Sequence, residues 1–376
     1  MIQLENLTKT FKTPEGTTIA ADRVNMTVPS GEICILLGPS GCGKTTTLKM
    51  VNRLIQPTSG RILINGEDTS GLNDIELRRQ IGYVIQQIGL FPNMTVEENI
   101  CVVPKLLGWD MKEATKRAAE LIDLVGLDPN QYLNRYPKEL SGGQQQRIGV
   151  IRALAADPPV MLMDEPFGAI DPINREVIQN EFLKMQAELK KTIMFVSHDI
   201  DEAVKMGDKI AIFRAGKIEQ YASPNEILAH PKNAFVADFV GADRTLKRLR
   251  LLTTEDVLNR NTPALSRHMP VSEALKLCQQ ANSGLAVVVD ANHHPVAYLT
   301  LNELESDVGS VGDLAHPLKA TVPLGADLRA VVSEMFANDS FWLPCVDTDG
   351  HYLGTISQSD VTEKLSQVTN QVRGGA

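Results

Sequence analysis

Short apolar runs that end in polar residues are the first pattern along the chain. Three such runs, four or five residues long, span Ile33–Leu37, Val160–Met163 and Thr192–Val196. Runs of this length without polar alternation are typical of strands that are buried on both faces of a parallel sheet. Because the carboxyl ends of parallel strands lie at one edge of such a sheet, the polar residues that follow these runs are expected to meet there. The pattern predicts an α/β fold.

Helical periodicity describes two other segments in the first part of the chain. Residues 46–55 predict a helix that stops before Pro57 and Gly60. Apolar residues recur at helical spacing within residues 111–127, at Ala114, Ala118, Leu121 and Val125. For most of these four side chains we expect ordinary core packing.

The pattern changes after Gly241, where one plan of elements is used twice. Each copy is predicted as helix, strand, turn, strand and helix, which indicates an internal repeat. The first copy comprises Val271–Leu275, Ala286–Asp290 and Val296–Thr300, and the second comprises Leu324–Val331, Leu343–Asp347 and Tyr352–Ser357. A basic run precedes the repeat, at Arg244, Lys247, Arg248 and Arg250. We expect this run to be a solvated linker, with contact to an anionic membrane surface as the alternative.

Length and composition narrow the class of protein. A chain of 376 residues is too long for one ordinary core, so two or three units are expected. The net charge of -9 argues against a general nucleic-acid binder, which carries a basic patch or stripe. No apolar stretch is long enough to predict a membrane span, and the first residues lack the pattern of a secretory leader. The 5 scattered cysteines form no C-x-x-C pair, which favours the reducing cytosol over a disulfide framework or a zinc site.

The first apolar run leads into a glycine-rich motif. Its residues are Gly38, Pro39, Ser40, Gly41, Cys42, Gly43, Lys44 and Thr45, and Thr46 follows. The order of strand, G-x-x-x-x-G-K-[ST] and helix is the context in which backbone N–H groups and a helix N-terminus bind phosphate oxygens. We expect Lys44 to contact the β- and γ-phosphates and the Thr45 hydroxyl to ligate Mg²⁺. A purely structural glycine turn is the alternative, and the flanking elements disfavour it.

Two acidic residues, Asp164 and Glu165, follow the second apolar run. At the end of a buried parallel strand, Asp164 is expected to hold Mg²⁺ through water. Glu165 is expected to act as general base or to orient the attacking water. Taken alone, the pair fits a solvated loop start equally well, and the P-loop upstream is what favours the catalytic interpretation.

Leu140, Ser141, Gly142, Gly143 and Gln144 lie between these two motifs. A flexible turn is the ordinary meaning of Ser-Gly-Gly. A P-loop, LSGGQ and an acidic strand end, in that order, resemble the ATP-binding cassette (ABC) ATPase family. The resemblance covers roughly residues 1–240, and it implies a P-loop NTPase fold with a RecA-like core and a helical subdomain.

The resemblance also assigns roles to residues that local sequence leaves anonymous. It implies that His198, after the third apolar run, contacts the γ-phosphate and the catalytic water. It implies that Gln86 touches Mg²⁺ and senses a membrane partner. Residues 169–171 match the D-loop of the family, which ends at Asp171. Phe11 matches an aromatic that stacks on adenine, with core packing of Phe11 as an equal alternative.

In the family, the signature motif closes over the ATP held by a second copy. The resemblance therefore implies that Ser141 and Gly143 contact the γ-phosphate in trans, aided by a helix that begins near Gln144. Since the chain carries one P-loop and one LSGGQ, we expect a homodimer that sandwiches two ATP molecules. The mostly helical segment between Gln86 and Leu140 is the part that docks on a membrane permease in the family.

The duplicated plan resembles a tandem of cystathionine β-synthase (CBS) domains, an α+β regulatory module that often binds adenine nucleotides. Residues 357–360 fit its [ST]-x-x-D element, whose Asp holds a ribose, whereas the first copy has Ala297 for a glycine and Glu303 for the Asp. A dimerisation module without ligand is the alternative. The expected boundaries are 1–240 for the ATPase, 241–248 for a linker, 249–308 and 309–370 for two CBS domains, and 371–376 for a tail.

ABC ATPases with a C-terminal CBS pair are typical of importers of osmoprotectants such as glycine betaine, choline or carnitine, and residues 86–92 and 164–172 look like that subgroup. The resemblance implies an ATPase on the cytoplasmic face of the inner membrane, working with a permease and a separate solute-binding protein. This chain offers no aromatic cluster for a quaternary amine, because Trp109 and Trp342 fall in different predicted domains. The alternatives are an importer of another polar solute such as an amino acid, a soluble ABC ATPase of translation or DNA repair, and a nucleotide or osmotic sensor.

Overall fold

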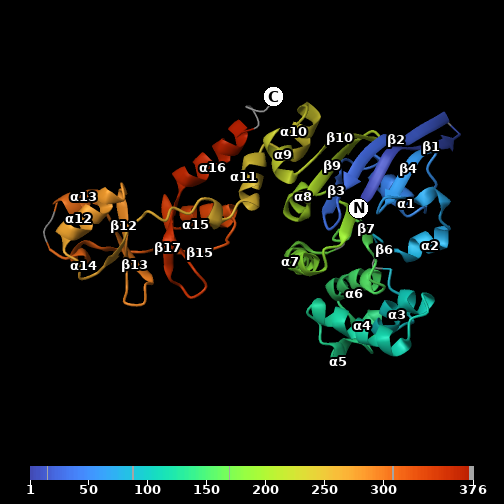
Figure 1. The fold of residues 1–376 in the computed structure, drawn as a ribbon, viewed down its shortest axis with the longest axis horizontal. Coiled ribbons are helices and arrows are strands. Elements are labelled where there is room, and N and C mark those ends of the chain that lie inside the picture. Colours follow the sequence, from blue (N-terminus) through green and yellow to red (C-terminus); the bar gives the residue numbers. More distant parts are fainter. Residues whose placement is uncertain (15, 87–88, 169, 307–308, 372–376) are drawn as a thin grey trace. The chain divides into compact units, whose positions relative to one another are not determined.

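The computed structural model describes residues 1–371 except 15, 87–88, 169 and 307–308, and leaves the side chains of 173, 306 and 367–371 undescribed. Two compact units, Met1–Gly241 and Ala242–Ala376, make up the chain (Figure 1). Each unit is considered by itself.

A six-stranded sheet forms the centre of the first unit, in the order β10-β9-β3-β8-β7-β6. Its strands are β3 (Ile33–Leu37), β6 (Ile81–Val84), β7 (Val160–Asp164), β8 (Thr192–Val196), β9 (Lys209–Arg214) and β10 (Lys217–Ala222). All neighbouring strands pair in parallel except β9 with β10. Every residue of β3, β7 and β8 is buried. The three apolar runs are therefore strands of one parallel sheet, as predicted, and their carboxyl ends share an edge.

An antiparallel sheet packs against this parallel sheet. Its order is β2-β1-β4-β5, with β1 (Ile2–Thr13), β2 (Gly16–Val28), β4 (Ser59–Ile64) and β5 (Glu67–Asp68). One apolar cluster joins the two sheets and the helix after the P-loop, and it includes Leu4, Val24, Leu36, Leu48 and Leu162. The P-loop therefore starts from a strand that is held on both sides by close packing.

The helix after the P-loop is shorter than predicted, because α1 spans only Lys44–Val51. Arg53 takes a left-handed φ of 48°. The N–H groups of Leu54 and Ile55 then bond back to the Lys49 carbonyl, at 2.9 and 3.2 Å. Bonds of this kind close a helix C-terminus, so the helix ends before the proline that was expected to stop it.

Helices α3 to α6 gather in a lobe beside the sheet (Figure 1). The helices of the first unit are α2 (Asp74–Arg79), α3 (Val96–Leu106), α4 (Met111–Leu124), α5 (Pro129–Tyr132), α6 (Gly142–Leu154), α7 (Pro172–Leu189), α8 (Ile200–Met206), α9 (Pro224–Ala229) and α10 (Ala234–Val240), with 3-10 turns at Thr69–Gly71 and Pro137–Glu139. Ala114, Ala118, Leu121 and Val125 are all buried, which confirms core packing for the stripe on α4.

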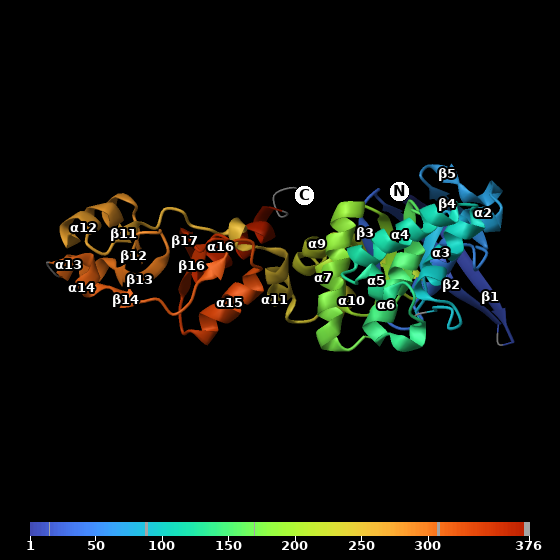
Figure 2. The ribbon, with the colours of Figure 1, turned by 90° about the horizontal axis from the view of Figure 1, so that it is seen from below.

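The second unit contains the duplicated plan. The first copy consists of β11 (Ala264–Ser266), α12 (Val271–Gln280), β12 (Leu285–Val289), β13 (Pro295–Thr300) and α13 (Leu301–Ser306), followed by α14 (Val311–Leu314) and β14 (His316–Pro317). The second copy consists of β15 (Val322–Pro323), α15 (Leu328–Ala337), β16 (Trp342–Val346), β17 (Tyr352–Ser357) and α16 (Gln358–Gln371). Each copy has its own sheet and its own apolar cluster, and the sheets lie next to each other in Figure 2. The predicted repeat is confirmed.

The basic run before the repeat is not solvated throughout, as it was expected to be. It forms α11 (Arg244–Arg248), with 3-10 turns following at Leu249–Leu251 and Thr254–Asp256. Lys247 and Arg248 are buried, at 9% and 5% exposure. The helix places Lys247 one turn after Asp243, and their Nζ and Oδ1 atoms lie 2.5 Å apart. Among the described helices of the chain, none has the length and apolar character needed to cross a bilayer.

Candidate nucleotide site

The P-loop is a backbone cradle whose glycines adopt conformations that residues with side chains rarely adopt. Gly38, Gly41 and Gly43 have φ values of 147°, 75° and 106°. A Cβ atom on Gly43 would lie 2.1 Å from the Ala20 carbonyl oxygen, and one on Gly38 would lie 2.4 Å from that of Phe213. Such a loop presents its N–H groups to an anion at the start of α1.

Lys44 lies across this cradle. Its side chain is 7% exposed, and Nζ donates to the carbonyl oxygens of Gly38 at 2.7 Å and Pro39 at 2.9 Å. Burial raises the pKa of the neighbouring Cys42 thiol, which makes it a packing group rather than a thiolate. The cradle therefore combines an ammonium group with backbone N–H groups of the loop, a combination that suits a polyphosphate.

Two oxygen groups that could ligate a divalent cation lie side by side. The Thr45 hydroxyl donates to Asp164 Oδ1 at 3.0 Å, and Lys49 Nζ lies 3.9 Å from Oδ2. Asp164 is 5% exposed, and burial raises the pKa of its carboxyl group. A buried carboxylate is stabilised by nearby positive charge, and hydroxyl and carboxylate oxygens are ligands that Mg²⁺ accepts. These residues fit a magnesium ion. Sequence reasoning missed Lys49, although its place one helical turn after Thr45 was a readable signal.

Glu165 is the point at which the candidate catalytic residues meet. It follows β7 directly and adopts a left-handed φ of 48°, a rare conformation for a residue with a side chain. Its Oε2 atom lies 3.4 Å from Gln86 Nε2, which follows β6, and 3.4 Å from His198 Nδ1, which follows β8. The shared sheet edge thus brings together three residues that are distant in sequence.

The signature residues form a helix start. Ser141 caps α6, whose first residue is Gly142, two residues before the predicted start. Ser141 Oγ accepts from the Gln144 N–H at 3.3 Å, and Gln144 Oε1 accepts from the Ser141 N–H at 2.9 Å. A third bond, from Gln144 Nε2 to the Tyr132 hydroxyl at 3.0 Å, holds this side chain in place.

A cavity of about 370 Å³ opens at this helix start, and Ser141, Gly142, Gly143 and Asp171 are among its lining residues. Its described lining contains no residue of the P-loop. Asp171 caps α7 by accepting from the Asn174 N–H at 3.1 Å. The D-loop match at Ala169, and the residues Gln87 and Ile88 of the subgroup match, lie outside the described residues. The structure therefore joins the signature motif to the D-loop and leaves both apart from the phosphate cradle.

Phe11 projects from β1 with 38% exposure and is not part of the described core. Lys9 Nζ lies 5.0 Å from the centroid of its ring. Core packing, one of the two interpretations of Phe11, is therefore wrong, because the side chain is on the surface. An aromatic ring with this exposure can stack on another ring.

The two [ST]-x-x-[DE] elements of the second unit differ in how the acid is used. Asp360 Oδ2 accepts from the N–H and the hydroxyl of Ser357, at 2.8 and 2.5 Å. Glu303 Oε2 accepts equivalent bonds from Thr300, but its Oε1 atom also pairs with His316 Nε2 at 2.6 Å. The first copy thus engages both carboxylate oxygens within the protein.

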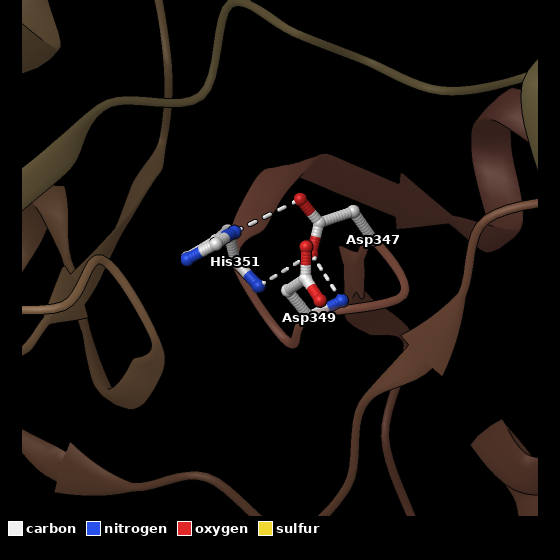
Figure 3. Close-up of side chains that lie close together, drawn as sticks. All are labelled: Asp347, Asp349 and His351. Carbon is white, nitrogen blue, oxygen red and sulfur yellow. Dashed lines mark hydrogen bonds and ion pairs between the residues drawn. The ribbon is translucent and has the colours of Figure 1, made fainter.

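Asp347, Asp349 and His351 form a second cluster with metal-ligand chemistry, in the turn between β16 and β17 (Figure 3). Asp347 Oδ1 accepts from the N–H groups of Asp349 and His351 at 2.9 and 2.8 Å, and Oδ2 lies 3.0 Å from His351 Nδ1. These bonds account for the cluster as a turn, and the first copy has an equivalent turn at Asp290 and His294.

Comparison with known proteins gives the same division of the chain. A model described as ABC transporter matches residues 21–168, and one described as CBS domain matches 255–306 and 311–367. The osmoprotectant import ATP-binding protein OsmV of Salmonella typhimurium is 57% identical over 97% of this chain and 96% of its own. The glycine betaine/carnitine/choline transport ATP-binding protein OpuCA of Bacillus subtilis is 45% identical over 96% of each chain. A dimeric ATP-binding cassette solved in a post-hydrolysis state with ADP and Pi has a TM-score of 0.54 and 37% identity, covering 60% of this chain and 99% of that one.

The fold and the site thus define an ABC transporter ATPase, a nucleotide-binding subunit that carries a tandem CBS pair. More narrowly, the chain belongs to the family of ATP-binding subunits of osmoprotectant importers. The family, fold class and ATPase activity expected from the sequence are confirmed, and the alternative of a soluble ABC ATPase of translation or DNA repair is disfavoured.

Proposed function

We propose that this chain powers the import of osmoprotectants, with quaternary amines such as glycine betaine, choline or carnitine as the cargo. The observation that carries the proposal is the convergence of Thr45, Asp164, Glu165 and His198 at one sheet edge, in a chain whose relatives are similar over nearly their whole length. Relatives named for osmoprotectants and for glycine betaine, carnitine and choline favour this cargo over an amino acid.

In ATP hydrolysis, we assign separate roles to the residues of the P-loop, the magnesium site and the sheet edge. Lys44 and the N–H groups of Gly41 and Gly43 hold the β- and γ-phosphates, with Ser40, Cys42 and Thr46 completing the loop. Thr45, Asp164 and Gln86 would hold Mg²⁺, which supplies charge neutralisation at the phosphates when bound. Glu165 accepts a proton from the attacking water, and His198 orients that water and the γ-phosphate. Phe11 stacks on the adenine.

The second half of each ATP site would come from a second copy of the chain. The cavity formed by Ser141, Gly143 and Asp171 is open and separate from the P-loop, and the helix start offers N–H groups to an anion. A homodimer that places this cavity over the γ-phosphate would complete two sites at once. The relative solved with ADP and Pi is itself dimeric, which supports this arrangement.

A groove of about 310 Å³ between β6 and the helical lobe is suited to a permease helix. Arg78, Tyr83, Phe91, Val102 and Arg152 are among its lining residues, and Phe91 is 46% exposed. Apolar side chains ringed by arginines can receive a short amphipathic helix. Docking there would hold the chain on the cytoplasmic face of the inner membrane, where it would work with a permease and a separate solute-binding protein.

We further propose that the boundaries at 240, 248, 308 and 370 separate working modules, and that the second CBS copy binds an adenine nucleotide. Asp360 uses only Oδ2 in the bonds to Ser357, whereas His316 blocks the equivalent Glu303. Removal of residues 249–376 should abolish the salt dependence of ATP turnover by the permease complex. An unchanged salt response would leave the CBS pair as a dimerisation module.

Uptake of labelled glycine betaine tests the proposed function. Cells with the native permease and either this chain or its Glu165→Gln variant would be compared at high and low osmolarity. We expect osmotically stimulated uptake with the native chain and its loss in the variant, because the variant binds ATP without hydrolysing it. Equal uptake in both strains would reject this cargo while leaving the ATPase assignment intact.

A further inference from the structure

A buried carboxyl group, that of Glu202, lines one small cavity together with Glu165 and His198. Glu202 is on α8 and is only 8% exposed. A buried carboxylate is costly unless hydrogen-bond donors surround it. Glu202 has two such donors, since Gln179 Nε2 lies 2.9 Å from Oε1 and the Ser197 hydroxyl bonds to Oε2.

The neighbouring donors fix the direction of these bonds. The N–H of Asp199 donates to Ser197 Oγ at 3.0 Å. The Ser197 hydroxyl hydrogen is therefore available for Glu202, and Gln179 fills the other oxygen with an amide N–H. Burial, and to a lesser degree Asp199, raises the pKa of Glu202, while the bonds from Ser197 and Gln179 and the charge of Arg175 act in the other direction. Two donors aimed at the two oxygens suit the ionised form.

One arm of this network reaches the catalytic histidine. Ser197 is 2% exposed, and its N–H donates to the Leu36 carbonyl at 3.1 Å, beside the start of the P-loop. His198 is the next residue, and its Nδ1 atom lies 3.4 Å from Glu165 Oε2. A shift of the Ser197 side chain would therefore move the backbone that aims His198.

The other arm reaches the helix that begins at the D-loop. Gln179 is on α7, which Asp171 caps. On the same helix, Arg175 donates from Nη2 to the Ile170 carbonyl at 2.8 Å, and its Nη1 atom lies 3.9 Å from Asp199 Oδ2. The strand end that carries His198 is thus tied to α7 at two points, one of them buried.

We infer that Glu202 is a positioning residue for ATP hydrolysis, which fixes His198 through Ser197 and ties it to α7 through Gln179. The inference rests on the role proposed for His198. It assigns no contact with ATP or water to Glu202, whose effect on the rate would pass through His198 alone.

Turnover and binding of ATP by the purified full chain give the first test. We expect Glu202→Ala to lower kcat by roughly tenfold to a hundredfold, the range associated with misplaced catalytic groups, with the Kd of ATP nearly unchanged. Glu202→Gln should restore most of the rate, because its amide oxygen still accepts from Ser197 while Gln179 turns its own amide to accept in return. An equal loss in both variants would contradict the inference.

Two glutamines on α7 provide a matched control. Gln179 and Gln186 are both buried, at 5% and 7% exposure, but Gln186 bonds to the carbonyls of Gly31 and Lys191 instead. Gln179→Ala should lower kcat, whereas Gln186→Ala should reduce stability alone. This comparison remains decisive if Glu202→Ala fails to fold.

The His198→Ala background separates this inference from the proposed site. If Glu202 acts through His198, Glu202→Ala should cause no further loss of kcat in that background. A further loss as large as in the native chain would show that Glu202 acts elsewhere and would overturn the inference. If His198→Ala alone left kcat unchanged, the role proposed for His198 would fail, and the inference with it.

Discussion

At the scale of single residues, the P-loop glycines differ in what a side chain would cost at each position. Gly43 combines a φ of 106° with a Cβ position 2.1 Å from a carbonyl oxygen, whereas Gly41 has a φ of 75° and open space around its Cβ position. Left-handed backbone costs about 1–2 kcal/mol for a residue with a side chain, and forcing extra atoms into packed space costs about 1–3 kcal/mol more. The two positions therefore separate backbone strain from steric overlap.

We expect Gly43→Ala to lower the free energy of unfolding by about 2–5 kcal/mol, the sum of the two effects. Gly41→Ala should cost only about 1–2 kcal/mol, because it adds strain without overlap. Urea unfolding of the two variants without nucleotide measures the difference. Equal destabilisation would mean that the backbone near Ala20 yields to the added methyl group.

Glu202 also predicts a pH dependence of stability. Its pKa in the folded protein is raised above the ordinary value of 4.5, chiefly by burial. The folded state therefore holds this proton at pH values where the unfolded state has released it, so its stabilising effect is present below 4.5 and is lost as pH rises through the folded pKa. The unfolding free energy of Glu202→Gln should thus improve relative to the native chain as pH rises from 4 to 7. A difference that is constant over this range would contradict the raised pKa.

At the scale of elements, the helix boundaries differ from the expected ones, since α1 ends at Val51 and α6 begins at Gly142. The chain folds α6 from Ser141, so the signature motif is a capping box as well as a candidate phosphate contact. Ser223 also caps its helix, α9, by accepting from the Glu226 N–H at 3.3 Å. Both serine hydroxyls therefore accept from the N–H three residues on, but Ser141 also belongs to a capping box with Gln144, and only Ser141 is proposed to contact ATP.

Ser141→Ala and Ser223→Ala should each lower the unfolding free energy by about 1 kcal/mol, the usual effect of losing a serine cap. Only Ser141→Ala should also weaken ATP-dependent dimerisation, because only Ser141 is proposed to reach the γ-phosphate of the partner. Unfolding measurements test the predicted loss of stability, and sedimentation of each variant with ATP tests the predicted effect on dimerisation. Normal dimerisation of Ser141→Ala would remove the proposed trans contact.

At the scale of the whole molecule, the proposed dimer would draw two unlike surfaces of each chain into its ATP sites. The P-loop edge and the signature cavity share no described lining residue, so a monomer would hold ATP on one side only. We expect Glu165→Gln to accumulate as a dimer in the presence of ATP, because hydrolysis is what would reopen the sandwich. Size-exclusion chromatography measures this state, and Lys44→Ala, which should not bind ATP, is the matched control. A monomeric Glu165→Gln chain saturated with ATP would contradict the dimer.

Much of the fold and the site could be read from local patterns. The strands β3, β7 and β8, the repeat in the second unit and the P-loop all follow from apolar runs and spacing, because those signals are contained within a few neighbouring residues. The end of α1 at Val51 was missed because a left-handed Arg53 has no strong sequence signal. The buried Lys247 and Arg248 were missed because charge alone predicts solvation, whereas burial depends on what packs around the side chain.

The sequence by itself determined the class of the protein, since the chemistry of a P-loop, LSGGQ and an acidic strand end is written in contiguous residues. Only the tertiary structure decided which distant groups act together. It brought Gln86 and His198 within 3.4 Å of Glu165 and left Phe11 exposed. It also paired Glu303 with His316 and buried Glu202, which bonds to Gln179 and Ser197. The physical reason is that these contacts join the ends of separate strands and helices, and their distances are set by sheet order and packing rather than by spacing along the chain.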